Sequence, residues 1–97
     1  MMEGEFSMAK YRKKPLIIEA FLTLYVIEAV KYNWKALPEC VSNAYESGNV
    51  IFLTNAIIIN TLEGHLRADI DDMIICGVKG ELYPCKPDIF AATYEPA

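Results

Sequence analysis

The most informative stretch of the sequence for the fold is residues 68–90, which read Ala68-Asp69-Ile70-Asp71-Asp72-Met73-Ile74-Ile75-Cys76-Gly77-Val78-Lys79-Gly80-Glu81-Leu82-Tyr83-Pro84-Cys85-Lys86-Pro87-Asp88-Ile89-Phe90. An acidic pair typical of turns precedes the apolar run 73–76, and a Gly-x-x-Gly segment, 77–80, separates that run from a second one, 81–85. Two such runs joined by a short glycine-containing segment are typical of a β-hairpin. We therefore expect two antiparallel strands here.

Three further strands are expected before this hairpin, in the runs 50–54, 56–62 and 65–69. Only Asn55 separates the first two runs, so a bend or bulge fits that connection as well as a tight hairpin does. Glu63-Gly64 is predicted to form a two-residue turn into the third. After residue 85, we expect a short helical turn at 87–90 and a closing strand at 93–95.

The N-terminal half predicts one strand and one or two helices. Residues 11–21 are predicted to form a strand, which contains Pro15 and an apolar, β-branched run. Residues 23–32 are ambiguous: the apolar spacing and Thr23 as an N-cap favour a helix, although Tyr, Val and Ile are poor helix formers. Helix is our prediction. Residues 37–47 carry a clearer helical pattern, with one apolar face and Gly48 just past the end.

The predicted order is a strand, helices, and then an antiparallel β-meander of about five strands, which is an α+β fold. Residues 8–97 are long enough for a single domain. Residues 1–7 show no periodicity, and we interpret them as a disordered extension or a cloning remnant outside the fold.

The composition indicates self-association. The chain of 97 residues is 54% hydrophobic, and a domain of this size leaves much of its surface exposed. Some apolar surface is therefore expected to be covered by a second copy, giving a homo-oligomer, a dimer or larger. No apolar run reaches the roughly 18–20 residues that span a bilayer, and no export signal is apparent. We expect a cytoplasmic protein with three reduced cysteines, because an odd count argues against a complete disulfide framework.

The net charge of −4 is unevenly distributed. Four of the nine cations lie at positions 10 and 12–14, whereas the chain from residue 15 onward has eleven acids and five bases. An acidic body disfavours a surface that follows the phosphates of DNA or RNA. The basic cluster is more typical of a solvated strand edge, so nucleic acid is not an expected partner.

Several strings in the sequence are distinctive. Two lie near the N-terminus, Met8-Ala9-Lys10-Tyr11-Arg12-Lys13-Lys14-Pro15 and Ile18-Glu19-Ala20-Phe21. Four lie in the C-terminal half, Thr61-Leu62-Glu63-Gly64, Gly77-Val78-Lys79-Gly80-Glu81, Tyr83-Pro84-Cys85-Lys86-Pro87-Asp88-Ile89-Phe90 and Thr93-Tyr94-Glu95. Over about two-thirds of the chain, the sequence resembles a family of small, uncharacterised phage and prophage proteins that carry these strings.

One departure from that family lies at Ile70-Asp71-Asp72, where the family has Pro-Gly-Asp. Asp tolerates turns but adopts positive φ less freely than Gly, so we expect the turn to persist without a close backbone approach to a ligand. The resemblance implies bacteriophage origin and location in the host cytosol. It implies no activity, because none is established for the family.

Residue types that can carry chemistry are present without a recognised spacing. His65, Cys76 and Cys85 lack the paired arrangement of a zinc site, so no metal site is predicted. Cys76 lies in an apolar strand, while Cys85 beside Lys86 is in a slightly better environment for a thiolate. We expect structural roles for both, and predict no catalytic residue and no cofactor.

Two loop motifs are also interpreted as structural. The acidic residues Asp69, Asp71 and Asp72 are followed by an apolar strand and not by the Gly and Glu of a calcium loop, which favours a turn. Residues 77–80 lack the helix and the Lys-Ser/Thr pair of a phosphate-binding loop, which favours a hairpin turn.

Three hypotheses for function follow. The first is a phage accessory protein that binds a host or phage protein without catalysis, in an anti-defence or morphogenesis role. The second is an oligomer that binds a nucleotide between subunits, and the third is a small enzyme using His65 and Cys85. Aromatic and basic side chains supply the candidate residues for ligand or partner binding, which are Trp34, Tyr45, Arg67, Lys79, Tyr83 and Lys86.

Overall fold

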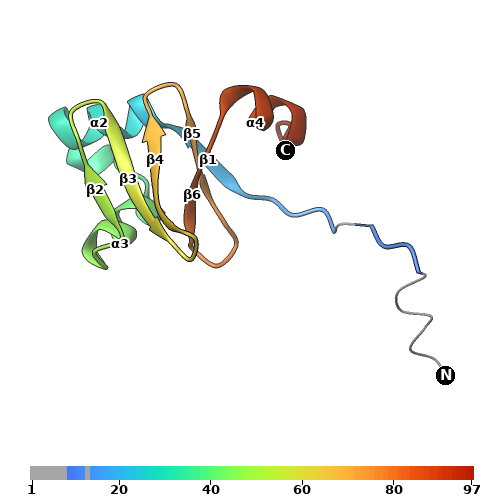
Figure 1. The fold of residues 1–97 in the computed structure, drawn as a ribbon. Coiled ribbons are helices and arrows are strands. Elements are labelled where there is room, and N and C mark those ends of the chain that lie inside the picture. The colour runs from blue at the N-terminus through green and yellow to red at the C-terminus, as the bar shows by residue number, and fades with distance from the viewer. Residues whose placement is uncertain (1–8, 13) are drawn as a thin grey trace.

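The computed structural model describes residues 9–12 and 14–97, and the extension predicted for residues 1–7 lies outside them. The order of elements confirms the predicted α+β class (Figure 1). The elements are β1 (Glu19–Leu22), α2 (Thr23–Tyr32), the 3₁₀ helix η1 (Trp34–Ala36), α3 (Glu39–Glu46), β2 (Val50–Phe52), β3 (Ala56–Thr61), β4 (Gly64–Asp69), β5 (Met73–Cys76), β6 (Leu82–Cys85) and α4 (Pro87–Thr93).

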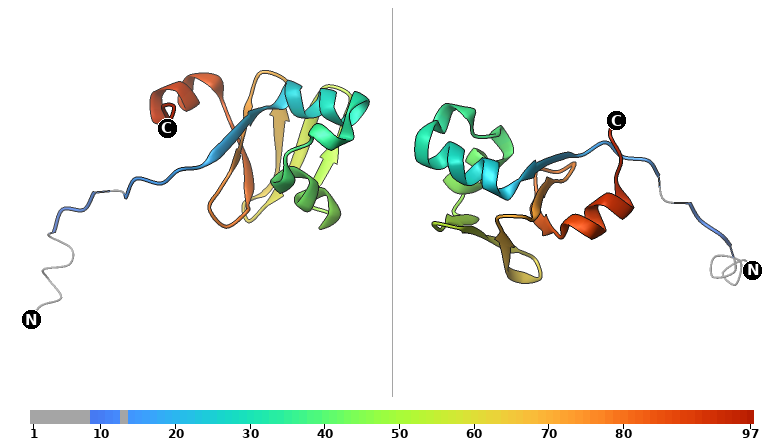
Figure 2. Two further views of the ribbon diagram at one scale, coloured as in Figure 1. Left: turned by 180° about the vertical axis from the view of Figure 1, so that it is seen from behind. Right: turned by 90° about the horizontal axis from the view of Figure 1, so that it is seen from above.

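The strands form two three-stranded antiparallel sheets, in the orders β1-β5-β6 and β2-β3-β4. Successive strands β4 and β5 therefore belong to different sheets, and the predicted meander is divided between them. Strand β6 packs against β3 and β4, which joins the two sheets. Figure 2 shows α2 and α3 on one face of the β2-β3-β4 sheet, and the main core lies between these helices and both sheets.

The short connection between β2 and β3 is a tight hairpin. The Leu53 amide donates to the carbonyl of Ala56 at 2.9 Å, so Thr54 and Asn55 alone form the turn. The next turn is formed by residues 62–63, one residue earlier than predicted. The reason is that Gly64 pairs with Thr61 as the first residue of β4, with a φ of +111° that only glycine adopts readily.

The third hairpin, between β5 and β6, follows the prediction. The Gly77 amide donates to the carbonyl of Glu81 at 2.8 Å, and the Gly80 amide donates to the carbonyl of Gly77 at 2.9 Å. Gly80 has a φ of +83°. A turn followed by a left-handed residue is the usual three-residue hairpin loop, which accounts for the glycine at its end.

The first strand is much shorter than the predicted 11–21. Its partner β5 ends at Cys76, directly opposite Glu19, and the chain beyond Cys76 enters the hairpin loop. Residues 14–18 consequently have no strand to pair with. Leu16 and Ile17 are 59% and 79% exposed, and Figure 1 shows the segment leading away from the body of the protein. We refer to residues 9–12 and 14–18 as the N-terminal arm.

The closing strand predicted at residues 93–95 is wrong. The helical turn predicted at 87–90 is confirmed, but it continues as α4 to Thr93, and the Tyr94 amide still donates to the carbonyl of Phe90 at 2.9 Å. The rings of Phe90 and Tyr94 stack with centroids 5.1 Å apart. Aromatic side chains four residues apart stabilise a helix, so this segment is helical and does not form a strand.

Both predicted helices form. In α2, Val26 and Ile27 are buried in the core together with Ala29, and this burial outweighs the weak helical propensity of Val and Ile. Thr23 is the first residue of α2 and makes no N-cap bond of its own. The helix predicted at 37–47 is formed as α3, preceded by the short η1.

Asp72, in the turn between β4 and β5, connects three parts of the fold. Its amide donates to the carbonyl of Asp69 at 2.9 Å, which closes the turn. Its carboxylate accepts from the Asp69 amide at 2.8 Å and from the Lys86 ammonium at 3.1 Å. Its carbonyl accepts from the Thr23 amide at 3.0 Å and from the Thr23 hydroxyl at 2.8 Å. Because Asp72 is only 3% exposed, water cannot easily replace these partners.

We predict that Asp72→Ala lowers the free energy of unfolding by roughly 2–4 kcal/mol, because it removes a charged acceptor and leaves the Asp69 amide without its side-chain partner. The neighbouring Asp71→Ala is the matched control, since Asp71 is exposed and should change stability by less than about 0.5 kcal/mol. Urea denaturation measures both values. Equal losses in the two variants would contradict the role assigned to Asp72.

Candidate functional site

A groove with a volume of about 880 Å³ lies where the tips of two hairpins meet α3. The β3–β4 and β5–β6 hairpins lie side by side at this end of the molecule (Figure 1). The groove is lined by Cys40, Asn43, Ala44, Ser47, Asn49, residues 59–63, Leu66 and residues 79–84.

The groove combines apolar walls with a small excess of negative charge. Ile59 and Leu82 are part of the buried core, while Leu62 is fully exposed at the hairpin tip. Its charged lining residues are Glu63, Glu81 and Lys79. Glu81 also accepts a bond from the Lys79 amide at 3.0 Å, so its carboxylate is held close to the loop. A groove of this kind suits an apolar segment that carries positive charge.

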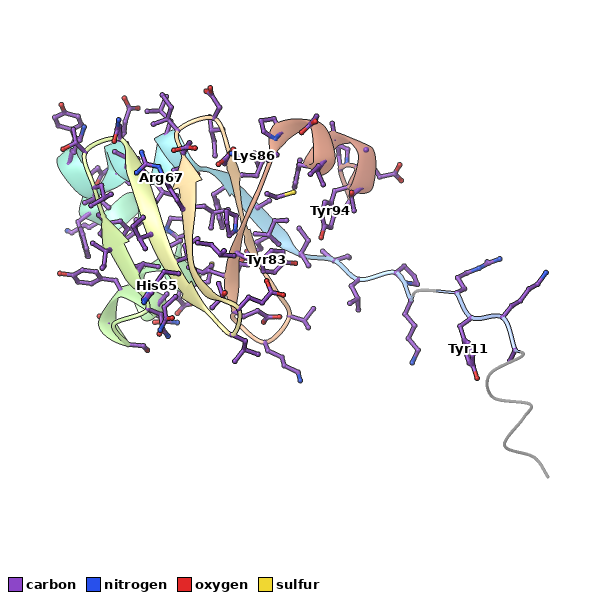
Figure 3. The ribbon with its side chains drawn as sticks, in the orientation of Figure 1. Tyr11, His65, Arg67, Tyr83, Lys86 and Tyr94 are labelled. Atoms are coloured by element: carbon purple, nitrogen blue, oxygen red, sulfur yellow. The ribbon has the colours of Figure 1, made fainter. Side chains whose placement is uncertain are left out.

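Tyr83 lines the groove and lies near Tyr94, the residue that follows α4. Burial, the hydrogen bond with Tyr94 and the nearby charges of Glu81 and Cys85 together raise the pKa of its phenol to about 12. Figure 3 shows Tyr83 and Tyr94 on the side of the molecule from which the N-terminal arm leaves. Tyr83 therefore stays protonated well into the alkaline range and acts as a hydrogen-bonding group.

The raised pKa of Tyr83 predicts a loss of stability at alkaline pH. A folded-state pKa above the ordinary 10.0 contributes stability that is complete below pH 10 and is lost as the pH rises toward about 12. We therefore expect Tyr83→Phe to be less stable than the wild type at neutral pH and the difference to shrink over this range. Urea denaturation at a series of pH values measures it.

The control is Tyr32→Phe, which alters a side chain that is 82% exposed. Its unfolding free energy should follow the wild-type curve at every pH. Parallel curves for the wild type and Tyr83→Phe would contradict the assignment to Tyr83.

The six residues predicted from the sequence as a binding site do not form one site. Lys79 and Tyr83 line the groove. Trp34 and Tyr45 lie elsewhere, in an aromatic cluster beside the edge strand β2. Arg67 and Lys86 lie near the turn between β4 and β5, as Figure 3 shows.

The aromatic cluster consists of Trp34, Tyr45 and Phe52. Trp34 meets Tyr45 edge-on with ring centroids 5.4 Å apart, and Tyr45 stacks on Phe52 at the same separation. Trp34 and Tyr45 are 47% and 48% exposed, so the cluster covers the rim of the core and also presents an apolar surface.

The two basic residues near the turn are engaged in ion pairs. The Arg67 Nε lies 2.6 Å from Asp69 Oδ1, and the Lys86 Nζ lies 3.1 Å from Asp72 Oδ2. The Arg67 hydrogen bond lowers the pKa of Asp69, and the hydrogen bond to Asp72 raises the pKa of Lys86. Both cations are thus paired with carboxylates of the same chain, which leaves them poorly suited to bind a phosphate.

The structure contradicts the expectation that Lys86 gives Cys85 a slightly better environment for a thiolate. Lys86 directs its ammonium to Asp72 and so does not favour a thiolate at Cys85. Burial raises the pKa of Cys85, and the charges of Asp72 and Asp88 raise it further. Its thiol is therefore protonated at neutral pH and is a weak nucleophile.

A different cluster brings together side chains that the sequence did not connect. The described residues contain one group of three metal-binding side chains whose ligand atoms all lie within 4.8 Å of one another, and it consists of Glu19, Cys40 and Cys76. His65 and Cys85 do not belong to it. Burial, Cys76 and Glu19 together raise the pKa of Cys40 to about 12. All three cysteines of the chain are free.

The sequence contains no local signal for this cluster because each residue belongs to a different element. Glu19 and Cys76 are partners in the β1–β5 register, so their side chains lie on the same face of the sheet. Cys40 comes from the first turn of α3. Only the pairing of β1 with β5 and the position of α3 reveal the group.

Comparison with known proteins gives no relative: no family model, curated protein or solved structure matches the chain. The resemblance to phage proteins therefore stays a prediction. Within residues 9–12 and 14–97, no helix has both the length and the apolar character needed to cross a membrane.

Proposed function

We propose that this is a phage or prophage accessory protein that acts in the bacterial cytosol by binding protein without catalysis, and that it holds an extended, basic and apolar segment in the groove between its hairpin tips. The observation that carries the proposal is the composition of the groove. Its apolar walls favour aliphatic side chains, and the pair Glu63 and Glu81 outnumbers the single base Lys79 among its charged residues.

The segment proposed to occupy the groove is the N-terminal arm of a second copy. The arm carries Lys10, Arg12 and Lys14, followed by the exposed aliphatic residues Leu16 and Ile17. Its positive charge complements the groove, and its aliphatic side chains match the apolar walls. Burying Leu16 and Ile17 would stabilise the assembly by about 1.5–3 kcal/mol for each side chain.

Exchange of arms gives a closed assembly. Each copy presents one arm and one groove, so two copies can bind reciprocally through the same pair of surfaces. Figure 1 shows the arm leading away from its own body, which leaves it free to reach a neighbour. The arm and groove therefore support a dimer as the binding form of the protein.

The other two hypotheses have less support. A nucleotide would bring negative charge to a groove with an acidic excess, while Arg67 and Lys86 are already paired with Asp69 and Asp72. An enzyme using Cys85 would need a thiolate, and the raised pKa of Cys85 opposes its formation. Protein binding is consequently the function that we propose.

We predict that the wild type forms a dimer. The double variant Leu16→Ser, Ile17→Ser should raise the dissociation constant of this dimer by at least about a hundredfold, because two aliphatic side chains that the dimer buries are lost. Analytical ultracentrifugation measures this constant. Ile51→Ser is the matched control, since Ile51 is 56% exposed on a strand outside the groove and should leave the dimer intact.

We also predict that Glu63→Lys, which reverses a charge in the groove, weakens the dimer, whereas Glu28→Lys on the exposed face of α2 does not. An excess of a peptide with the sequence of residues 9–18 should dissociate the wild-type dimer by occupying the groove. A monomeric wild type, or a dimer that withstands both the arm substitutions and the peptide, would contradict the proposal.

A further inference from the structure

Three side chains with metal-binding atoms meet where β1, β5 and α3 come together. Glu19 and Cys76 face each other across the β1–β5 pair, and Cys40 approaches from the first turn of α3. Their ligand atoms all lie within 4.8 Å of one another. From this arrangement, we propose that Glu19, Cys40 and Cys76 bind one zinc ion.

The spacing of the three ligand atoms fits a tetrahedral metal. Zinc binds thiolate sulfur at about 2.3 Å and carboxylate oxygen at about 2.0–2.2 Å, which places neighbouring ligand atoms about 3.5 Å apart. The ligand atoms, all within 4.8 Å of one another, are at most about 1.3 Å farther apart than this. Three protein ligands leave a fourth position, which a water molecule fills in many zinc sites.

The chemical types of the ligands favour zinc over other cations. Magnesium and calcium prefer sets made only of oxygen, and monovalent copper prefers soft sulfur ligands. A mixed set of two sulfur atoms and one carboxylate suits zinc, which accepts sulfur, nitrogen and oxygen. The carboxylate is therefore the residue that distinguishes zinc from copper here.

Binding can occur without adding charge to this partly buried place. Zinc replaces the two thiol protons, which are released to solvent, so the net charge of the site is the same before and after. Cys76 is 7% exposed while Glu19 is exposed, so the ion would enter from the carboxylate side.

A bound ion would link α3 to the paired strands β1 and β5. Glu19 is the first residue of β1 and directly follows the arm, while Cys40 also lines the groove. Zinc would therefore fix the base of the arm against α3 and β5. Because the unfolded chain does not present this arrangement, binding is expected to stabilise the folded protein.

The test is zinc uptake by the reduced, chelator-treated full chain, followed by native mass spectrometry. The wild type should gain one zinc ion per chain, and Cys85→Ser should gain the same, because Cys85 lies outside the cluster. Cys40→Ser should weaken zinc affinity by at least about a hundredfold, since losing a direct ligand costs more than losing a hydrogen-bonding partner of a ligand. Glu19→Gln should weaken it as well.

Cobalt supplies a second readout, since it occupies zinc sites and absorbs light when bound to thiolates. The wild type and Cys85→Ser should show this absorption, and Cys40→Ser should not. The test uses no Cys76 variant, because replacing this buried side chain could also destabilise the fold. Zinc uptake that is equal in Cys40→Ser and Cys85→Ser would overturn the proposal. So would a wild type that takes up no zinc, including one in which Cys40 and Cys76 form a disulfide.

Discussion

The buried carboxylate and carbonyl of Asp72 are the contacts on which the relative positions of the two sheets and α2 depend. Strands β4 and β5 follow each other in the chain but lie in different sheets, so the turn between them sets how the sheets meet. The carbonyl holds the first turn of α2 through Thr23, and the carboxylate holds Lys86 at the end of β6. One residue therefore fixes three elements that are distant in sequence.

The charged residues around the turn between β4 and β5 differ in role from those at the hairpin tips. The carboxylates of Asp69 and Asp72 and the cations of Arg67 and Lys86 satisfy one another around the turn. At the hairpin tips, Glu63 lines a groove without such a network among the described ion pairs. The charges that look most like a binding site in the sequence are thus structural, and the open surface lies at the other end of the strands.

Local patterns in the sequence predicted which runs form the hairpins, because turn residues and apolar runs determine them over short distances. The connection at Asn55 was left open, and the turn before β4 was placed one residue late. The hairpin of residues 73–85 and the helix at 23–32 formed as predicted, the latter because its apolar face is buried. The length of β1 could not be predicted, since it depends on where β5 ends. The strand expected at 93–95 failed because a contact between Phe90 and Tyr94 extended the helix instead.

The residues of the candidate site were harder to predict, because elements distant in sequence bring them together. All six candidate residues were grouped by residue type. Lys79 and Tyr83 line one groove because they belong to one hairpin, whereas Trp34 and Arg67 lie elsewhere. The cluster of Glu19, Cys40 and Cys76 requires strand pairing and helix position at once. A cluster that forms only through strand pairing and helix position has no recognisable spacing in the sequence.

The exposed arm has a consequence for how this protein can change over time. Leu16 and Ile17 lie outside the core, and the strand that follows begins only at Glu19. Substitutions in the arm should therefore cost little folding free energy. Under the proposed arm exchange, the binding partner of the arm could therefore change with little effect on the body, so that binding and folding could evolve separately.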